Sequence, residues 1–157
     1  MKRPINSNIC LILLLLLFFI TACDNKTVYH SFQHIPDIGW KKNDTLTYTF
    51  ELKDSMVYLH LFAEVRNRND YPYQNLYIAI SQNLKDSMTW KSDTLNLSLA
   101  DKKGKWVGNG WGNLFQISVP ISNVLATHPG KYTLKISQEM KDNPLKGIND
   151  VGIRIEK

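Results

Sequence analysis

Apolar and polar residues alternate with a period of two along most of the chain after residue 45. Such alternation is typical of β-strands that bury one face. Seven segments show it, over residues 46–52, 57–65, 76–81, 95–99, 115–119, 132–136 and 151–155. Turn sequences such as Lys53-Asp54-Ser55 and His128-Pro129-Gly130 separate them, and no long helical repeat is evident. The pattern predicts one all-β domain over residues 45–157.

A strand with one apolar face needs a second layer of structure to cover that face. We therefore predict an antiparallel β-sandwich of about seven strands, Ig-like or jelly-roll-like, with a closed barrel as the alternative. Pro120 should end the fifth strand or place it at a sheet edge. Residues 122–127 are expected to form a short helical turn. Residues 25–44 are mostly polar and contain the breakers Pro36 and Gly39, so they predict a tether of roughly 20 residues. We expect it to pack back onto the domain in part, through Ile35, Ile38 and Trp40.

The N-terminal segment has the order of features found in export signals. Lys2 and Arg3 precede an unbroken apolar run over residues 9–20. A helix of that length rises about 18 Å, well short of a hydrocarbon core of roughly 30 Å, so the run fits a signal peptide rather than a membrane span. The run leads into Ile20-Thr21-Ala22-Cys23, which resembles the lipobox of bacterial lipoproteins.

This resemblance implies cleavage before Cys23 and attachment of lipid to its thiol. The expected organisation is a signal peptide over residues 1–22, a lipidated N-terminus and tether over residues 23–44, and the β-domain over residues 45–157. Cys10, the second of the two cysteines, leaves with the signal peptide. No free thiol then remains for a disulfide, a nucleophile or a thiolate metal site.

Composition and charge fit one globular domain. The chain has 157 residues, of which 43% are apolar and 21% charged, and a formal charge of +5. Cleavage before Cys23 lowers the charge to +3, because Lys2 and Arg3 are removed. The remaining basic residues are scattered, and the short cluster over residues 102–105 fits a solvated loop. We therefore expect no nucleic-acid partner.

The titratable residues form no recognisable catalytic or metal-binding motif. His30 and His34 have the spacing of metal ligands on a helix, but no third ligand at a matching spacing accompanies them. His60 and His128 have no serine or cysteine partner in a nucleophile motif. We therefore expect no enzyme activity, no metal and no cofactor apart from the covalent lipid on Cys23. A hydrolase would need paired carboxylates across a cleft or a nucleophile–base pair.

Two segments are candidates for recognition of a partner. Residues 108–112 are rich in glycine, which predicts a bulge or a close backbone approach rather than a phosphate loop. Trp106 precedes this segment and Trp111 lies within it, either as core aromatics or as exposed rings that contact a sugar or a protein. The polar connection over residues 67–75 carries Tyr71 and Tyr73. It is either a self-structured hairpin loop or an exposed loop that recognises a partner. The Tyr71-Pro72 bond is a candidate for the cis form.

Several motifs in this part of the chain resemble the GldH family of gliding motility lipoproteins. The Val65–Leu76 segment is similar to the family pattern LRNNxxYPYxNL. Further similar segments follow in family order, at residues 93–95, 99–110, 130–133, 138–141 and 145–157. The chain departs from the family with Gln138-Glu139-Met140-Lys141, where Gln-Ala-Met-Arg is common, and before Gly130, where it lacks a Phe-Pro pair.

The resemblance implies an envelope lipoprotein required for gliding motility. It would act as a non-enzymatic component or accessory of the machinery that moves or secretes surface adhesins, with envelope proteins as partners. We expect attachment through lipid to the outer membrane, on its periplasmic side. The alternative is a carbohydrate- or peptidoglycan-binding module, which would use the aromatic residues near the loops.

Overall fold

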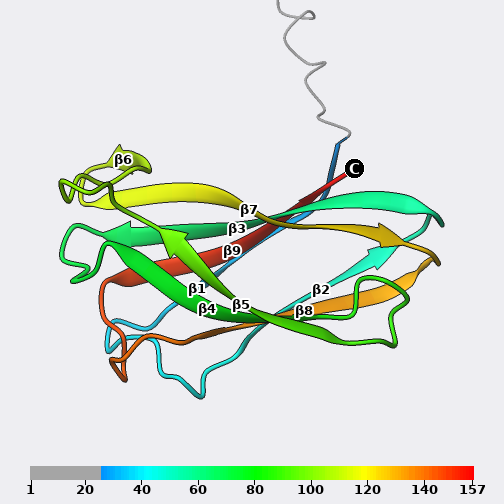
Figure 1. The fold of residues 1–157 in the computed structure, drawn as a ribbon, viewed down its shortest axis with the longest axis horizontal. Helices are drawn as coiled ribbons and strands as arrows, with labels where there is room; N and C mark the ends of the chain where they lie inside the picture. Colours follow the sequence, from blue (N-terminus) through cyan, green and yellow to red (C-terminus); the bar gives the residue numbers. More distant parts are fainter. Residues whose placement is uncertain (1–25) are drawn as a thin grey trace, which may run out of the picture.

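The computed structural model describes residues 26–157, which form two antiparallel β-sheets stacked as two layers (Figure 1). The five-stranded sheet has the order β1 (Thr27–His34), β9 (Ile148–Glu156), β3 (Val57–Arg68), β7 (Leu114–Ala126) and β6 (Asn109–Trp111). The four-stranded sheet has the order β2 (Leu46–Leu52), β8 (Gly130–Gln138), β4 (Asn75–Gln82) and β5 (Lys91–Ser98). The described residues contain no helix, so the predicted all-β class is confirmed.

The core lies between the two sheets and consists of the apolar phase of the alternating strands. In β3 the buried positions are Leu59, Leu61, Ala63 and Val65, and in β8 they are Tyr132, Leu134 and Ile136. One hydrogen bond also crosses the core, because the Tyr48 hydroxyl of β2 donates to the Val151 carbonyl of β9 at 2.7 Å. The arrangement is the predicted sandwich rather than a closed barrel.

The expected tether contains an additional strand. Residues 27–34 form β1, which pairs along its length with β9 at the edge of the five-stranded sheet. Trp40 is buried and forms an isolated bridge with Leu145, so the following segment also packs onto the domain. Among the described residues, the first strand therefore begins at Thr27. The signal peptide over residues 1–22 and Cys23 lie outside the described residues.

The predicted helical turn over residues 122–127 was wrong. Strand β7 continues through Pro120 to Ala126 and stays paired with β3, with a register shift opposite Leu61 and Phe62. Strand β6 pairs with β7 only over Leu114–Gln116. Pro120 therefore lies in the part of β7 that β6 does not cover, where a missing N–H group removes no bond between strands. Its predicted edge position is confirmed, whereas the predicted end of the strand is not.

The Asn67–Asn75 connection is not a hairpin, because it joins β3 in one sheet to β4 in the other. The Tyr71 hydroxyl donates to the Asn75 carbonyl at 2.8 Å, so the connection is partly held by its own side chains. Tyr71-Pro72, a candidate cis bond from the sequence, is not cis, and the cis peptide among the described residues lies at Asn143-Pro144.

The sandwich has two ends that carry different connections. The first, which we call the terminal end, comprises residues 26, 53–56, 83–90, 127–131 and 157. Contacts tie these segments together: Lys157 N–H donates to the Lys26 carbonyl, Lys157 Nζ contacts Asp54, and Thr127 N–H donates to the Lys85 carbonyl. The second, the loop end, comprises residues 35–45, 69–74, 99–108, 112–113 and 139–147. No helix among the described residues is long and apolar enough to cross a membrane.

Candidate functional site

The outer face of the five-stranded sheet carries a row of polar side chains near the loop end. The alternation that sends Val65 and Val151 into the core sends Arg66 and Asp150 outward. The strand register then aligns His34, Asp150, Arg66 and Gln116 across β1, β9, β3 and β7. The polar row therefore draws its members from four strands.

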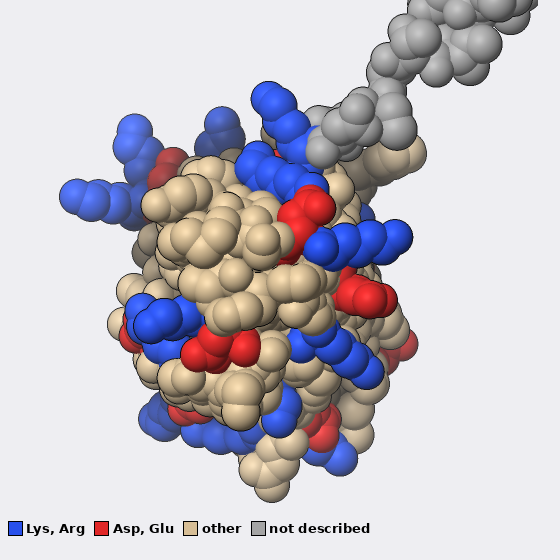
Figure 2. All heavy atoms as spheres, turned by 90° about the vertical axis from the view of Figure 1, so that its right-hand side faces the viewer, with Lys and Arg blue, Asp and Glu red and all other residues tan. Residues whose placement is uncertain are grey.

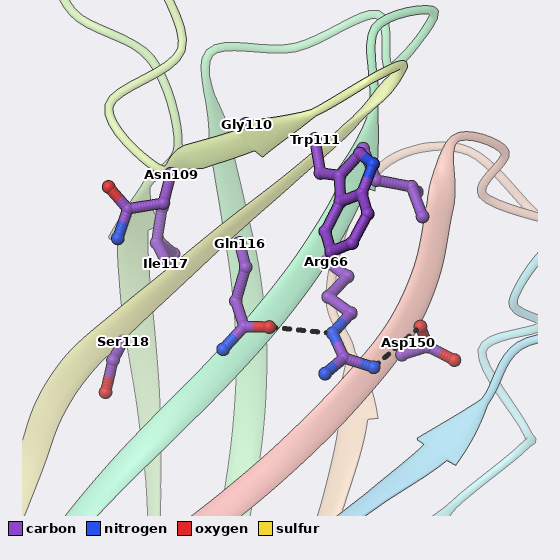
Figure 3. Close-up of a pocket in the computed structure, with 9 residues that line it drawn as sticks. Arg66, Asn109, Gly110, Trp111, Gln116, Ile117, Ser118 and Asp150 are labelled. Atoms are coloured by element: carbon purple, nitrogen blue, oxygen red, sulfur yellow. Dashed lines mark hydrogen bonds and ion pairs between the residues drawn. The ribbon is translucent and has the colours of Figure 1, made fainter.

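Contacts within this row fix the Arg66 guanidinium. Arg66 Nε donates to Gln116 Oε1 at 2.8 Å, and Arg66 Nη1 lies 3.6 Å from Asp150 Oδ2 (Figure 3). The other Asp150 oxygen lies 3.1 Å from His34 Nδ1. The Arg66 guanidinium also stacks 3.8 Å from the centre of the Phe32 ring. Such contacts pre-organise a cation for binding a ligand.

Phe32 reaches this position because the residue beneath it is glycine. A Cβ atom on Gly152 would lie 2.7 Å from the Phe32 ring. The ring thus lies between the Gly152 backbone and the Arg66 guanidinium. A larger side chain at position 152 would displace the ring and with it the platform for Arg66.

A second polar group lies next to this row. The Glu64 side chain is only 4% exposed although it is on the outer face of the sheet. Its two oxygens contact His30 Nε2 at 2.7 Å and Arg154 Nε at 3.0 Å. Arg154 also bonds Ser118 at 3.1 Å and stacks over the Phe62 ring. The Arg154 guanidinium and the His30 ring therefore cover this carboxylate.

The β6–β7 hairpin places Trp111 beside the row. Gly112 and Asn113 form its two-residue turn, with Gly112 at a φ of 63°, which suits glycine at the first turn position. The Trp111 side chain is 90% exposed. The predicted close backbone approach is found at Gly108, where a Cβ atom would lie 2.5 Å from the Gln116 carbonyl oxygen.

Together these residues enclose an open pocket of about 700 Å³. Trp111 and Arg66 lie on one side, and Asn109 and Ser118 on the other (Figure 3). Its polar lining offers the donors Arg66 and Asn109 and the acceptor Asp150. An exposed indole beside such groups suits a ligand with an apolar face and polar edges.

The structure separates the four aromatic residues singled out from the sequence. Tyr71, Tyr73 and Trp106 form one cluster with Phe115 at the loop end, with ring centroids 5.8–6.3 Å apart. Tyr71 is buried there, and burial raises the pKa of its hydroxyl above the usual range. A hydrogen bond to Asp142 raises the pKa of the partly exposed Tyr73. Only Trp111 stands at the pocket.

The histidines are arranged differently from a metal site. His30 and His34 lie on strand β1 and face outward, where each contacts a carboxylate on a different strand. Four residues along a strand span about 13 Å, too far for both to bind one ion. Within residues 26–157, no group of three or more His, Cys, Asp and Glu side chains could hold a metal ion.

Sequence reasoning missed Arg66, Gln116 and Asp150. Each occupies the polar phase of its strand, which on an exposed sheet face is the ordinary expectation. One signal was available in the sequence: Gly152 occupies an outward-facing position of β9 where a polar side chain is expected. Glycine inside a strand indicates that another group approaches the backbone closely. Cys23, the predicted lipidation site, lies outside the described residues.

Comparisons with known proteins agree on one family. The model of the GldH lipoprotein family matches residues 27–155. The gliding motility lipoprotein GldH homolog of Christiangramia forsetii is 32% identical over 149 residues, covering 90% of each chain. The gliding motility lipoprotein GldH of Flavobacterium johnsoniae is 30% identical over 158 residues, covering 96% of each chain.

Solved structures overlap with the sandwich only loosely. A family GH115 4-O-methyl-α-glucuronidase has a TM-score of 0.47 and 15% identity, covering 85% of this chain and 18% of the enzyme. A β-fructofuranosidase from Schwanniomyces occidentalis has a TM-score of 0.40 and 11% identity, covering 86% of this chain and 35% of the enzyme. Overlaps of this quality carry no argument about function.

Proposed function

Since the chain belongs to the GldH lipoprotein family, we propose that it is a membrane-anchored envelope lipoprotein of gliding motility. It acts as a non-enzymatic component or accessory of the machinery that moves or secretes surface adhesins. The observation that carries this proposal is the match over 90% or more of both chains to relatives named for gliding motility. The similarity thus spans the whole sandwich rather than one motif.

Lipid on Cys23 provides the membrane attachment in this proposal. The lipobox-like sequence Ile20-Thr21-Ala22-Cys23 supports this attachment. In this proposal the protein sits on the periplasmic side of the outer membrane. Replacing Cys23 by alanine should leave an unlipidated precursor that takes up no labelled palmitate. Incorporation of palmitate into that variant would refute the assignment of the lipid to Cys23.

We class the fold as jelly-roll-like rather than Ig-like. Apart from β6, the facing orders are β1-β9-β3-β7 and β2-β8-β4-β5. Most successive strands therefore change sheets, as in a jelly roll built from two Greek keys. This connectivity places long connections at both ends, where partner proteins can reach them.

A binding role fits the side chains of the candidate site better than catalysis does. Both carboxylates near the pocket are engaged by an arginine and a histidine: Glu64 by Arg154 and His30, and Asp150 by Arg66 and His34. Trp111 contributes a large exposed surface of the kind that anchors protein partners. We therefore place the partner-binding surface at the loop end, around Trp111, with Trp106 and Tyr73 beside it.

Deletion and complementation test the motility role. A gliding relative that lacks the gene should lose colony spreading, and the wild-type gene should restore it. A Trp111→Ala variant should accumulate normally but fail to restore spreading and fail to capture its partner after cross-linking of intact envelopes. The matched control is Trp90→Ala, since Trp90 is exposed but lies at the terminal end. Normal spreading and adhesin export in the deletion strain would refute the proposal.

A second candidate function is binding of a carbohydrate or peptidoglycan fragment in the pocket. The juxtaposition of Trp111 with Arg66, Asp150 and Asn109 favours it, because sugars combine an apolar face with hydroxyl groups. Glycan arrays and soluble muropeptides should show binding that Trp111→Ala abolishes and Trp90→Ala preserves. Absence of binding by the wild-type lipoprotein would exclude this function.

A further inference from the structure

The first described strand begins close in sequence to the proposed lipid anchor. Strand β1 starts at Thr27, four residues after Cys23. Fully extended, four residues span at most about 14 Å. If Cys23 carries the lipid, as the proposed function requires, the start of β1 cannot leave the neighbourhood of the bilayer. The terminal end lies beside that start, because Lys157 contacts both Lys26 and Asp54.

This end of the sandwich exposes large apolar side chains. Met56 is 64% exposed in the connection between β2 and β3, and Tyr58 follows it on the outer face of β3. Met88 is exposed in the connection between β4 and β5. Met56 and Met88 come from two separate connections at the same end, and Tyr58 lies on β3 next to the first of them. Tyrosine suits the boundary between water and lipid, because its ring is apolar and its hydroxyl polar.

Basic residues accompany the apolar ones. The terminal end has two aspartates, Asp54 and Asp86, and five lysines: Lys26, Lys53, Lys85, Lys131 and Lys157. Asp54 contacts Lys157, and Asp86 accepts bonds from the N–H groups of Met88 and Thr89. Figure 2 faces this end and shows Lys and Arg side chains, interspersed with Asp and Glu, around an uncharged area of surface. Such a surface complements anionic lipid headgroups.

We propose that the terminal end rests on the membrane that holds the lipid anchor. Met56, Tyr58 and Met88 enter the headgroup layer, and the surrounding lysines contact anionic phosphates. This contact fixes the orientation of the domain, because anchor and surface together allow little tilt. The pocket at Arg66 is nine residues along β3 from Val57, so it lies about 30 Å farther from the membrane along that strand.

Site-specific fluorescence can test this orientation in the full lipidated protein. An introduced cysteine is the only free thiol once Cys23 carries lipid and Cys10 has been removed with the signal peptide. The Met56→Cys and Met88→Cys variants are labelled with an environment-sensitive dye. They are then reconstituted into vesicles of phosphatidylethanolamine and phosphatidylglycerol that contain brominated phospholipid as the quencher. The matched control is Ile38→Cys, because Ile38 is 63% exposed but lies at the loop end.

The dyes at positions 56 and 88 should lose about half or more of their fluorescence to the brominated lipid, while the dye at position 38 keeps nearly all of it. If the protein floats with the vesicles but none of the three dyes is quenched, the docked orientation is refuted and the anchor stands. Equal quenching at all three positions also refutes it. If the protein does not float with vesicles, the lipid on Cys23 and the orientation both fall.

Discussion

The buried carboxylate of Glu64 allows a sharp test of the outer-face network. Replacing Glu64 by glutamine keeps the shape of the side chain but removes its charge. A carboxylate accepts from both His30 and Arg154, whereas an amide offers one oxygen and presents an NH₂ group to the other donor. The single amide oxygen can accept from Arg154, and His30 then pairs only in the tautomer whose Nε2 accepts, so the two charge-assisted bonds of the carboxylate are lost.

The size of the effect follows from exposure. Hydrogen bonds to charged groups contribute about 1.5–3 kcal/mol each. The side chains of Arg154 and His30 remain 23% and 43% exposed, so water screens part of that contribution. We expect a loss of about 2 kcal/mol, which lowers the melting temperature of a domain of this size by roughly 7 °C.

Thermal unfolding followed by circular dichroism measures this loss on the full-length lipoprotein. Glu51→Gln is the matched control, because Glu51 is exposed on β2 and should change stability by less than about 0.5 kcal/mol. A double-mutant cycle with Arg154→Met isolates the contact between the two side chains. If Glu64→Gln and Glu51→Gln have the same melting temperature, or the cycle shows no coupling energy between Glu64 and Arg154, then Glu64 does not stabilise the sheet through these contacts.

Three further predictions test other parts of the structure. Gly147→Ala should lower the free energy of unfolding by about 3 kcal/mol or more, and Gly104→Ala by only about 1 kcal/mol. Both glycines have a positive φ, but only at Gly147 would a Cβ atom lie against Tyr71, at 2.6 Å. Equal losses of stability in urea unfolding would contradict this reasoning. Burial raises the pKa of the Tyr48 and Tyr71 hydroxyls, so stability should be constant below pH ~10 and fall as the pH rises above it. In Tyr71→Phe the free energy of unfolding should decrease less steeply above pH ~10. An unchanged slope would contradict a contribution from the Tyr71 hydroxyl. Trp111→Ala should leave the melting temperature unchanged, since its side chain is 90% exposed; a large drop would show that the ring supports the fold.

The alternation of apolar residues was sufficient to predict the all-β class and the two-layer core. It failed at β1, where an edge strand leaves both faces partly exposed and the two phases of the strand are buried to similar extents. It also failed after Pro120, because a helical turn was expected where β7 continues along the edge of its sheet. Both errors concern edge positions, where neighbouring strands impose the least pattern on the sequence.

The candidate site could be predicted only in part. Trp111 and the glycines beside it were recognisable because exposed aromatics and close backbone approaches leave local signals. Arg66 and Asp150 are 84 residues apart, and their contact depends on the register of β3 against β9. Alternation determines which face a side chain occupies but not which residue of another strand lies next to it. The polar row therefore required the structure.

The proposed orientation has a consequence for recognition at the pocket. Fixed charges are screened over about 8 Å at physiological ionic strength, whereas the pocket lies about 30 Å from the terminal end. Headgroup charge therefore has little influence on Arg66 and Asp150, and ligand affinity depends on the pocket itself. A partner or glycan should bind the lipoprotein equally well in anionic and in zwitterionic vesicles, while Trp111→Ala weakens binding in both. Affinity that follows the anionic lipid content would place the pocket near the bilayer and contradict an upright domain.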